Sequence, residues 1–137
     1  MTKIIVDNGV SESGLTELDL TRFSQLKRLD IGDHCFSYVD ELKLIGMNEL
    51  ESVVIGENSF TQHKNYYGSD PNRHFHLKNC PKLKSLKIGY DSFSDYSVCE
   101  IDNMDALEVI EMGDLDACSY VFAYGSLELK SIIDRNE

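Results

Sequence analysis

The stretch from Leu50 to Phe60, LESVVIGENSF, decides the fold that we expect for this chain. Aliphatic residues stand at its first, fourth and sixth positions, a glycine follows directly, and a phenylalanine ends it. The aliphatic and glycine spacing returns three more times, with Met in place of Ile before the glycine in the last copy, and the phenylalanine returns in all copies except the last. The four copies start 24, 33 and 24 residues apart, at Leu26, Leu50, Leu83 and Leu107. Regular recurrence of this kind is the signature of a repeat protein.

A second apolar stripe lies between these copies and keeps the same register. Its members are Leu18, Leu20 and Phe23; Leu42, Leu44 and Met47; Phe75, Leu77 and Cys80; and Cys99, Ile101 and Met104. The interval from Leu42 to Phe75 is 33 residues rather than 24, so nine residues are inserted. We expect the insertion within residues 61–74, because the segment Tyr66–Asn72 has the composition of a loop.

Each stripe alternates with a period of two, which is the period of a strand. Leu29 and Ile31 would face the core while Arg28 and Asp30 face outward. Each unit then supplies two short strands, and stacking the units gives two parallel sheets around a shared core. The glycine after the first strand suits a sharp bend or a positive φ. A helical pattern of apolar residues is not present.

The segments Gly56–Phe60 (GENSF) and Gly89–Phe93 (GYDSF), with Asn79–Leu83 before the next strand, resemble leucine-rich repeats. The variant is similar to that of BspA-like and related protist multi-copy arrays, and the insert before Leu77 also resembles one in those arrays. The resemblance implies a leucine-rich repeat solenoid: mainly β, with short parallel strands on two faces, four to five coils and little helix. It also implies a surface that recognises other proteins.

We expect a single leucine-rich repeat domain over residues 1–137, with units at about 2–25, 26–49, 50–82, 83–106 and 107–133. The first unit is partial, with Ile4 to Val6 as its strand and Asn8-Gly9 as its turn. In the last unit the second stripe is delayed to Leu127 and Leu129. Neither end shows an evident cap, so either the chain is a slice of a longer array or its open strand edges pair with something, most simply head-to-tail with another copy of the chain.

Charge and composition exclude several classes of function. The chain has 13 Lys and Arg against 24 Asp and Glu, a net charge of −11. This acidic balance argues against nucleic acid and anionic membrane surfaces as partners. No apolar run reaches the ~20 residues of a membrane span. The apolar run near Met1 is too short for a signal peptide, so the cytoplasm is the default expectation and the compartment stays unknown.

The outward positions of the first sheet are the candidate partner-binding residues. They form two columns, Arg28, Ser52, Ser85 and Val109, and Asp30, Val54, Lys87 and Glu111. The alternative is that these side chains only stabilise the stack. Tyr66 and Tyr67 of the insertion are a second candidate, since tyrosine is common at interfaces, and packing as a lid over the core is their alternative.

Nothing in the sequence indicates catalysis, so we expect no enzyme, no cofactor and no catalytic residue. Motifs for phosphate binding, serine hydrolysis and zinc peptidases are absent. His74 and His76, with His63 or Asp70, could hold a metal, but a solvated strand edge is the simpler interpretation and we expect no metal site. The cysteines Cys80 and Cys99 occupy apolar slots, and no CxxC is present.

The sequence therefore favours a non-enzymatic protein–protein interaction scaffold that uses the exposed sheet face. The alternative is a structural protein that assembles head-to-tail through open solenoid ends. The protein partner cannot be identified from residue types and spacing.

Overall fold

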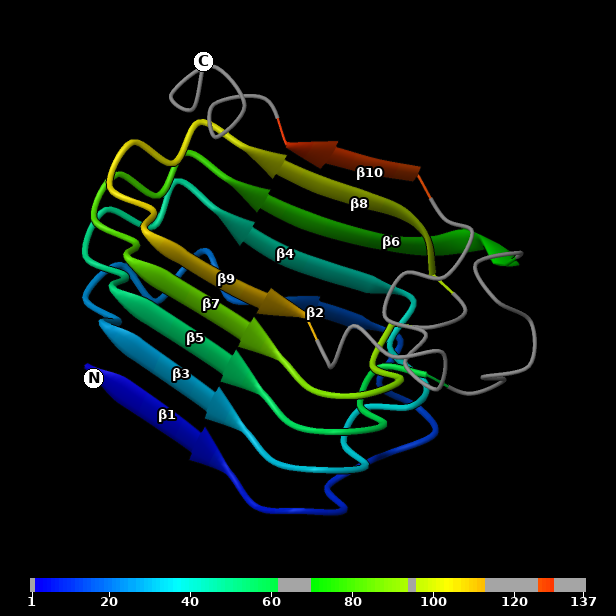
Figure 1. The fold of residues 1–137 in the computed structure, drawn as a ribbon. Helices are drawn as coiled ribbons and strands as arrows, with labels where there is room; N and C mark the ends of the chain where they lie inside the picture. The colour runs from blue at the N-terminus through cyan, green and yellow to red at the C-terminus, as the bar shows by residue number, and fades with distance from the viewer. Residues whose placement is uncertain (1, 62–69, 94–95, 113–125, 130–137) are drawn as a thin grey trace.

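The computed structural model describes residues 2–61, 70–93, 96–112 and 126–129, and within these ranges it contains strands and turns but no helix. The chain alternates between two five-stranded sheets (Figure 1). We call the sheet of strands β1, β3, β5, β7 and β9 the odd sheet and the sheet of β2, β4, β6, β8 and β10 the even sheet. Every pairing of neighbouring strands is parallel. The expected mainly β architecture with short parallel strands in two sheets is confirmed.

The strands are short except in the middle of the even sheet. The odd sheet consists of β1 (Lys3–Val6), β3 (Arg28–Ile31), β5 (Ser52–Ile55), β7 (Ser85–Ile88) and β9 (Val109–Met112). The even sheet consists of β2 (Glu17–Asp19), β4 (Glu41–Ile45), β6 (Asp70–Lys78), β8 (Tyr96–Asp102) and β10 (Ser126–Leu129).

Equivalent positions of successive units pair with one another in register. Leu29 pairs with Val53, Val53 with Leu86, and Leu86 with Ile110. The partial first unit joins the same row, because Ile4 pairs with Leu29. The alignment predicted from the spacing is therefore confirmed.

The delayed stripe of the last unit also takes its expected place. In β10, Leu127 pairs with Cys99 and Leu129 pairs with Ile101. The chain thus returns to the even sheet in register at β10.

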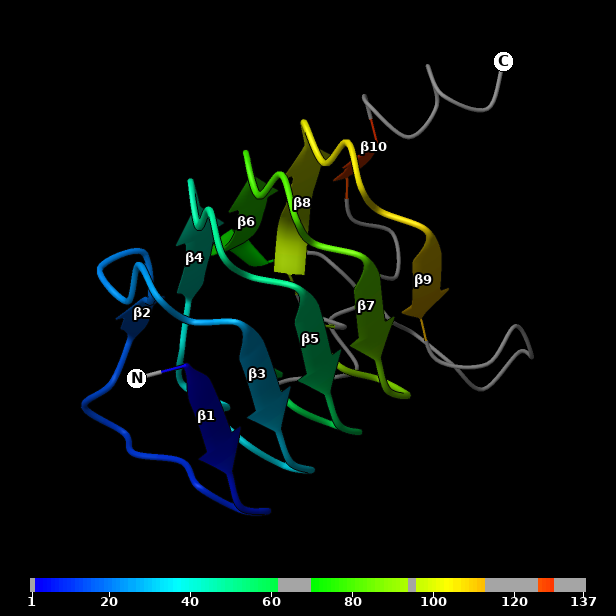
Figure 2. The same cartoon turned by 90° about the vertical axis from the view of Figure 1, so that its left-hand side faces the viewer.

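The core lies between the two sheets (Figure 2) and is built from the inward positions of both. The recurring phenylalanines form a stack at the turns that follow β3, β5 and β7. The ring centroids of Phe36 and Phe60 are 5.3 Å apart, and those of Phe60 and Phe93 are 4.8 Å apart with nearly parallel planes. Such ring pairs contribute about 0.5–1.5 kcal/mol beyond the area they bury.

The glycines after the odd strands are required by close packing rather than by a positive φ. A Cβ added to Gly56 would lie 2.7 Å from the carbonyl carbon of Gly32, and one added to Gly89 would lie 2.7 Å from that of Gly56. Both distances are too short for real atoms, so the backbones of successive units touch at this point. Neither glycine is among the residues with positive φ.

The left-handed conformations occur two and four residues after each of these glycines. In the third unit they are Asn58 and Phe60, with φ of 56° in both. The equivalent residues are His34 and Phe36, and Asp91 and Phe93. The phenylalanine thus enters the core from a turn in which residues other than glycine adopt the strained left-handed conformation.

Buried serines join successive turns. The backbone N–H of Ser59 donates to Oγ of Ser92 at 3.0 Å, and Ser92 Oγ donates to the carbonyl of Gly56 at 2.6 Å. In the preceding unit, the Cys35 N–H donates to Ser59 Oγ at 3.1 Å and Ser59 Oγ donates to the Gly32 carbonyl at 2.8 Å. Each serine therefore satisfies one donor and one acceptor that would otherwise be buried without a partner.

Replacing Gly56 by Ala should lower the free energy of unfolding by about 1–3 kcal/mol, the usual range for overpacking. The added methyl group would meet the Gly32 backbone at 2.7–2.8 Å and Oδ1 of Asp33 at 2.2 Å. Urea denaturation followed by circular dichroism measures the change. Gly14→Ala is the matched control, because its Cβ would meet nothing within 4 Å, and it should leave stability equal or slightly higher. Equal stability of Gly56→Ala and wild type would contradict the close packing.

Candidate functional site

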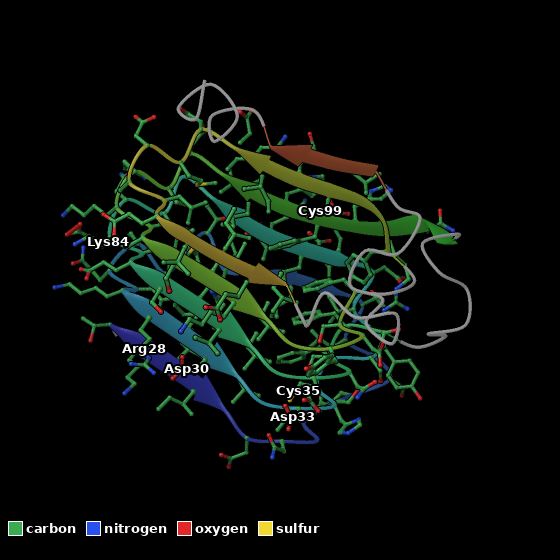
Figure 3. The ribbon with its side chains drawn as sticks, in the orientation of Figure 1. Arg28, Asp30, Asp33, Cys35, Lys84 and Cys99 are labelled. Carbon is green, nitrogen blue, oxygen red and sulfur yellow. The ribbon has the colours of Figure 1, made fainter. Side chains whose placement is uncertain are left out.

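The outer face of the odd sheet gathers eight of the residues that the sequence indicated as partner-binding. Strand pairing arranges them in two neighbouring rows, Arg28, Ser52, Ser85 and Val109 in one and Asp30, Val54, Lys87 and Glu111 in the other. Lys3 and Ile5 of β1 extend these rows at the N-terminal edge. Figure 3 shows Arg28 and Asp30 projecting outward from β3.

The two rows mix exposed charges with apolar groups. Arg28, Lys87 and Glu111 are exposed, and Val109 is exposed to 39%. The remaining members are half-buried by their neighbours, namely Asp30, Ser52, Val54 and Ser85. The face therefore offers a ridge of charged and apolar side chains over a rigid sheet.

Arg28 and Asp30 are paired on this face. Arg28 Nε donates to Asp30 Oδ2 at 2.9 Å, and the bond to this carboxylate raises the pKa of Arg28. The other carboxylate oxygen of Asp30 is buried and, within the described part of the chain, has no hydrogen-bond donor. Both members of this ion pair belong to β3, so the pair involves no side chain of β5 or β7.

An additional column of alternating charge lies where the odd strands begin. The backbone of Glu51 bonds to that of Lys27, Lys84 to Glu51, and Glu108 to Lys84, at 2.8–2.9 Å. Lys84 stands at this edge in Figure 3. Although neighbours in the column are opposite in charge, no ion pair within 4.0 Å joins their side chains in the described ranges.

The described lysines fall into two groups, those with and those without an ion pair. Pairs with carboxylates hold Lys43, Lys78 and Lys82. The described lysines without an ion pair are Lys3, Lys27, Lys84 and Lys87. All four belong to the odd strands or to the residues directly before them. The described lysines without an ion pair are thus concentrated along the odd strands of a strongly acidic protein.

The outer face of the even sheet, in contrast, is joined across its strands by ion pairs. Lys43 Nζ lies 3.3 Å from carboxylate oxygens of both Glu17 and Glu41, and these two residues raise the pKa of Lys43. His76 lies between Glu41 at 3.6 Å and Glu100 at 2.7 Å. These contacts link β2, β4, β6 and β8.

Glu100 receives the strongest contacts of this network. Its carboxylate lies 3.1 Å from Lys78 Nζ and 2.7 Å from His76 Nδ1. Lys78 first, and His76 after it, lower the pKa of Glu100 below its ordinary value of 4.5. The sequence analysis did not find this carboxylate. The spacing of 24 residues between His76 and Glu100, equal to one unit, is the signal that places them on neighbouring strands.

The two histidines of β6 lie on the same face, as expected from their spacing. The ring centroids of His74 and His76 are 6.1 Å apart, and Glu41 pairs with His74 in the strand register. No group of three or more His, Cys, Asp and Glu residues suited to a metal occurs among the described residues. His63 and the side chain of Asp70 lie outside the description.

A buried arginine is the feature that the sequence analysis missed. Arg73 of β6 is 1% exposed, and its Nη2 donates to the carbonyls of Ser37 and Val39 at 2.8 and 3.0 Å. Its guanidinium lies 5.0 Å from the ring centroid of Tyr96, whose hydroxyl donates to the Val39 carbonyl. Arg73 thereby fastens the start of β6 to the turn before β4. In the sequence Arg73 stands at the end of a polar loop segment, and nothing there indicates that its side chain is buried.

The described cysteines are reduced and buried. Cys35, Cys80 and Cys99 are free thiols inside the core. Burial raises the pKa of both Cys80 and Cys99, which disfavours the reactive thiolate form. Cys118 lies outside the described ranges.

Tyr66 and Tyr67, the second candidate from the sequence, also lie outside the described residues, as does most of the inserted segment. Their part in binding stays a prediction.

Comparisons with protein-family models, curated proteins and solved structures found no match to this chain. Among the described residues, none forms a helix long and apolar enough to cross a membrane.

Replacing Glu100 by Gln should make stability less dependent on pH at the acidic end. Because the folded-state pKa of Glu100 is lowered, its charged form stabilises the fold above the unfolded pKa, and this contribution is lost as pH falls through the folded pKa. The difference in unfolding free energy between wild type and Glu100→Gln should be largest near neutral pH and shrink as the pH falls below 4.5 and through the lowered folded-state pKa. Urea denaturation at several pH values measures it.

Glu111→Gln is the control for the loss of one negative charge, since Glu111 forms no ion pair within the described ranges. A difference between wild type and Glu100→Gln that stays constant from neutral to acidic pH would contradict the role of the ion pairs.

Proposed function

We propose that the chain is a leucine-rich repeat solenoid, of the kind found in BspA-like and related protist multi-copy arrays, and that it acts as a non-enzymatic protein–protein interaction scaffold. The spacing of 24 residues, the alternation of strands between two parallel sheets and the in-register rows support the solenoid. In such an architecture the sheet is framework, and its outward residues are free to vary with the partner.

The observation that carries the binding proposal is the difference between the two outer faces. On the even sheet the charged residues form ion pairs with one another, through Lys43, His76 and Lys78. On the odd sheet Lys84 and Lys87 have no ion pair among the described residues, and the apolar Val109 is exposed. A lysine without an internal ion pair is available to a carboxylate of a partner, and complementary charges of this kind favour specific and fast association. The outer face of the odd sheet is therefore the proposed binding surface.

Self-assembly through the ends of the stack is the second candidate function. It is favoured by the edge position of β1 and by Ile5, whose side chain is 62% exposed. An open edge strand with apolar residues is a template for pairing with another chain. In the head-to-tail form, β9 of one copy would pair with β1 of the next.

Reversing the charge of Arg28 or Lys87 should weaken binding of a natural partner by about tenfold or more, because each charge would then face a partner group selected for a cation. Affinity capture from the native source with the wild-type chain identifies a partner. Calorimetric titration then compares it with Arg28→Glu and Lys87→Glu.

Lys78→Glu is the matched control, since it makes the same charge change on the outer face of the even sheet. Its affinity should stay near that of the wild type. If both odd-sheet variants bind as the wild type does, the proposed surface is wrong. Thermal unfolding of each variant separates loss of binding from loss of fold.

A further inference from the structure

Within the described ranges, the strand at the N-terminal edge of the odd sheet pairs on one side only. β1 pairs with β3 on one side only and lies at the end of the strand order. The carbonyls of Thr2 and Val6 accept hydrogen bonds from the β3 side. Because backbone groups along a strand point alternately to its two sides, those of Lys3 and Ile5 point away from β3. They are available to a further strand.

Among the described residues, the core is also least covered at this end. Besides the fully buried core, the described apolar residues that pack against it while partly exposed are Ile4, Val6, Leu15, Leu18, Phe23 and Ile110. All but Ile110 belong to the first unit. Ile5, on the outer face, is 62% exposed and Val10 is 43% exposed. An apolar end next to free backbone groups is suited to association with another chain.

The sequence of this edge is complementary to itself in the antiparallel direction. The segment Lys3–Asp7 reads Lys-Ile-Ile-Val-Asp. When two copies are placed antiparallel with Ile5 opposite Ile5, Lys3 of each copy faces Asp7 of the other, and Ile4 faces Val6. The arrangement makes two equivalent charge pairs and places the most exposed apolar side chain on the two-fold axis.

The charges that meet in this arrangement have no partner inside the chain. Lys3 and Asp7 are both exposed and form no ion pair in the described ranges. The neighbour of Lys3 in the register of the sheet is Arg28, which has the same charge. A carboxylate from a second copy would relieve that repulsion.

We propose that two copies of this chain associate head-to-head through antiparallel pairing of β1 with β1, which joins their odd sheets into one continuous sheet. The interface is isologous, so the assembly closes at two copies. The inference rests on the second candidate function and replaces its head-to-tail mode. It is independent of the partner-binding face of the odd sheet.

Sedimentation equilibrium of the full chain over a range of concentrations tests the proposal. The wild type should show a monomer–dimer equilibrium. Lys3→Asp should raise the dimer dissociation constant about tenfold or more, because both charge pairs become repulsive. The double variant Lys3→Asp with Asp7→Lys should restore wild-type dimerisation, since the pairs are formed again with exchanged signs.

Val109→Asp on β9 is the control at the opposite edge, and it should leave the dimer unchanged. Circular dichroism confirms the fold of each variant. A strict monomer at the highest soluble concentration would overturn both the dimer and the self-assembly candidate. Species that grow beyond the dimer and are disrupted by Val109→Asp would overturn the head-to-head mode and support the head-to-tail one. Failure of the double variant to restore dimerisation would overturn the antiparallel register.

Discussion

The contact of one backbone turn with the next at Gly32, Gly56 and Gly89 is the constraint on which the rest of the structure depends. There the chain approaches its neighbour so closely that not even a methyl group fits. The serine hydroxyls beside these glycines bond the same carbonyls and the N–H groups of the adjacent unit. Together they fix the position of each turn, so that the following strands lie in register and the phenylalanine rings stack.

Once register is fixed, side chains at equivalent positions of successive units lie next to one another in a row and can interact. On the even sheet this places Glu41, His76 and Glu100 on three neighbouring strands, where they bond to one another. On the odd sheet the corresponding rows contain the Arg28–Asp30 pair within β3 and, on β5 and β7, serine, valine and a lysine that has no ion pair among the described residues. Two faces built by the same backbone therefore differ in how much of their charge is already neutralised internally.

The spacing of apolar residues was sufficient to predict the strands, their parallel pairing and their register, because burial of one face leaves a strand no other alignment. The row from Ile4 through Leu29 to Ile110 could be read directly, as could the late return at Leu127. The role of the glycines could not be predicted, since a close approach between turns and a positive φ both favour glycine in the sequence. Only the stacked backbones distinguish them.

The candidate surface was predictable as a set of outward positions, but its distinction from the other face was not. Ion pairs depend on side-chain reach across strands, and the partners of His76 stand a full unit away in sequence. Arg73 was missed for a related reason. Its burial depends on carbonyls near Val39 and on the ring of Tyr96, which come from a different unit on either side.

The longer spacing between the second and third copies has a consequence for how this chain tolerates change. The nine additional residues leave the pairing of Leu42 with Phe75 and of Phe75 with Cys99 unaltered. From His74 onward the strand register is thus the same as in the units without additional residues, and the buried Arg73 holds the chain directly before this regular pairing begins. The connection that precedes β6 is a natural place for the protein to acquire or exchange sequence, and for an engineer to graft a foreign peptide, without disturbing the stack.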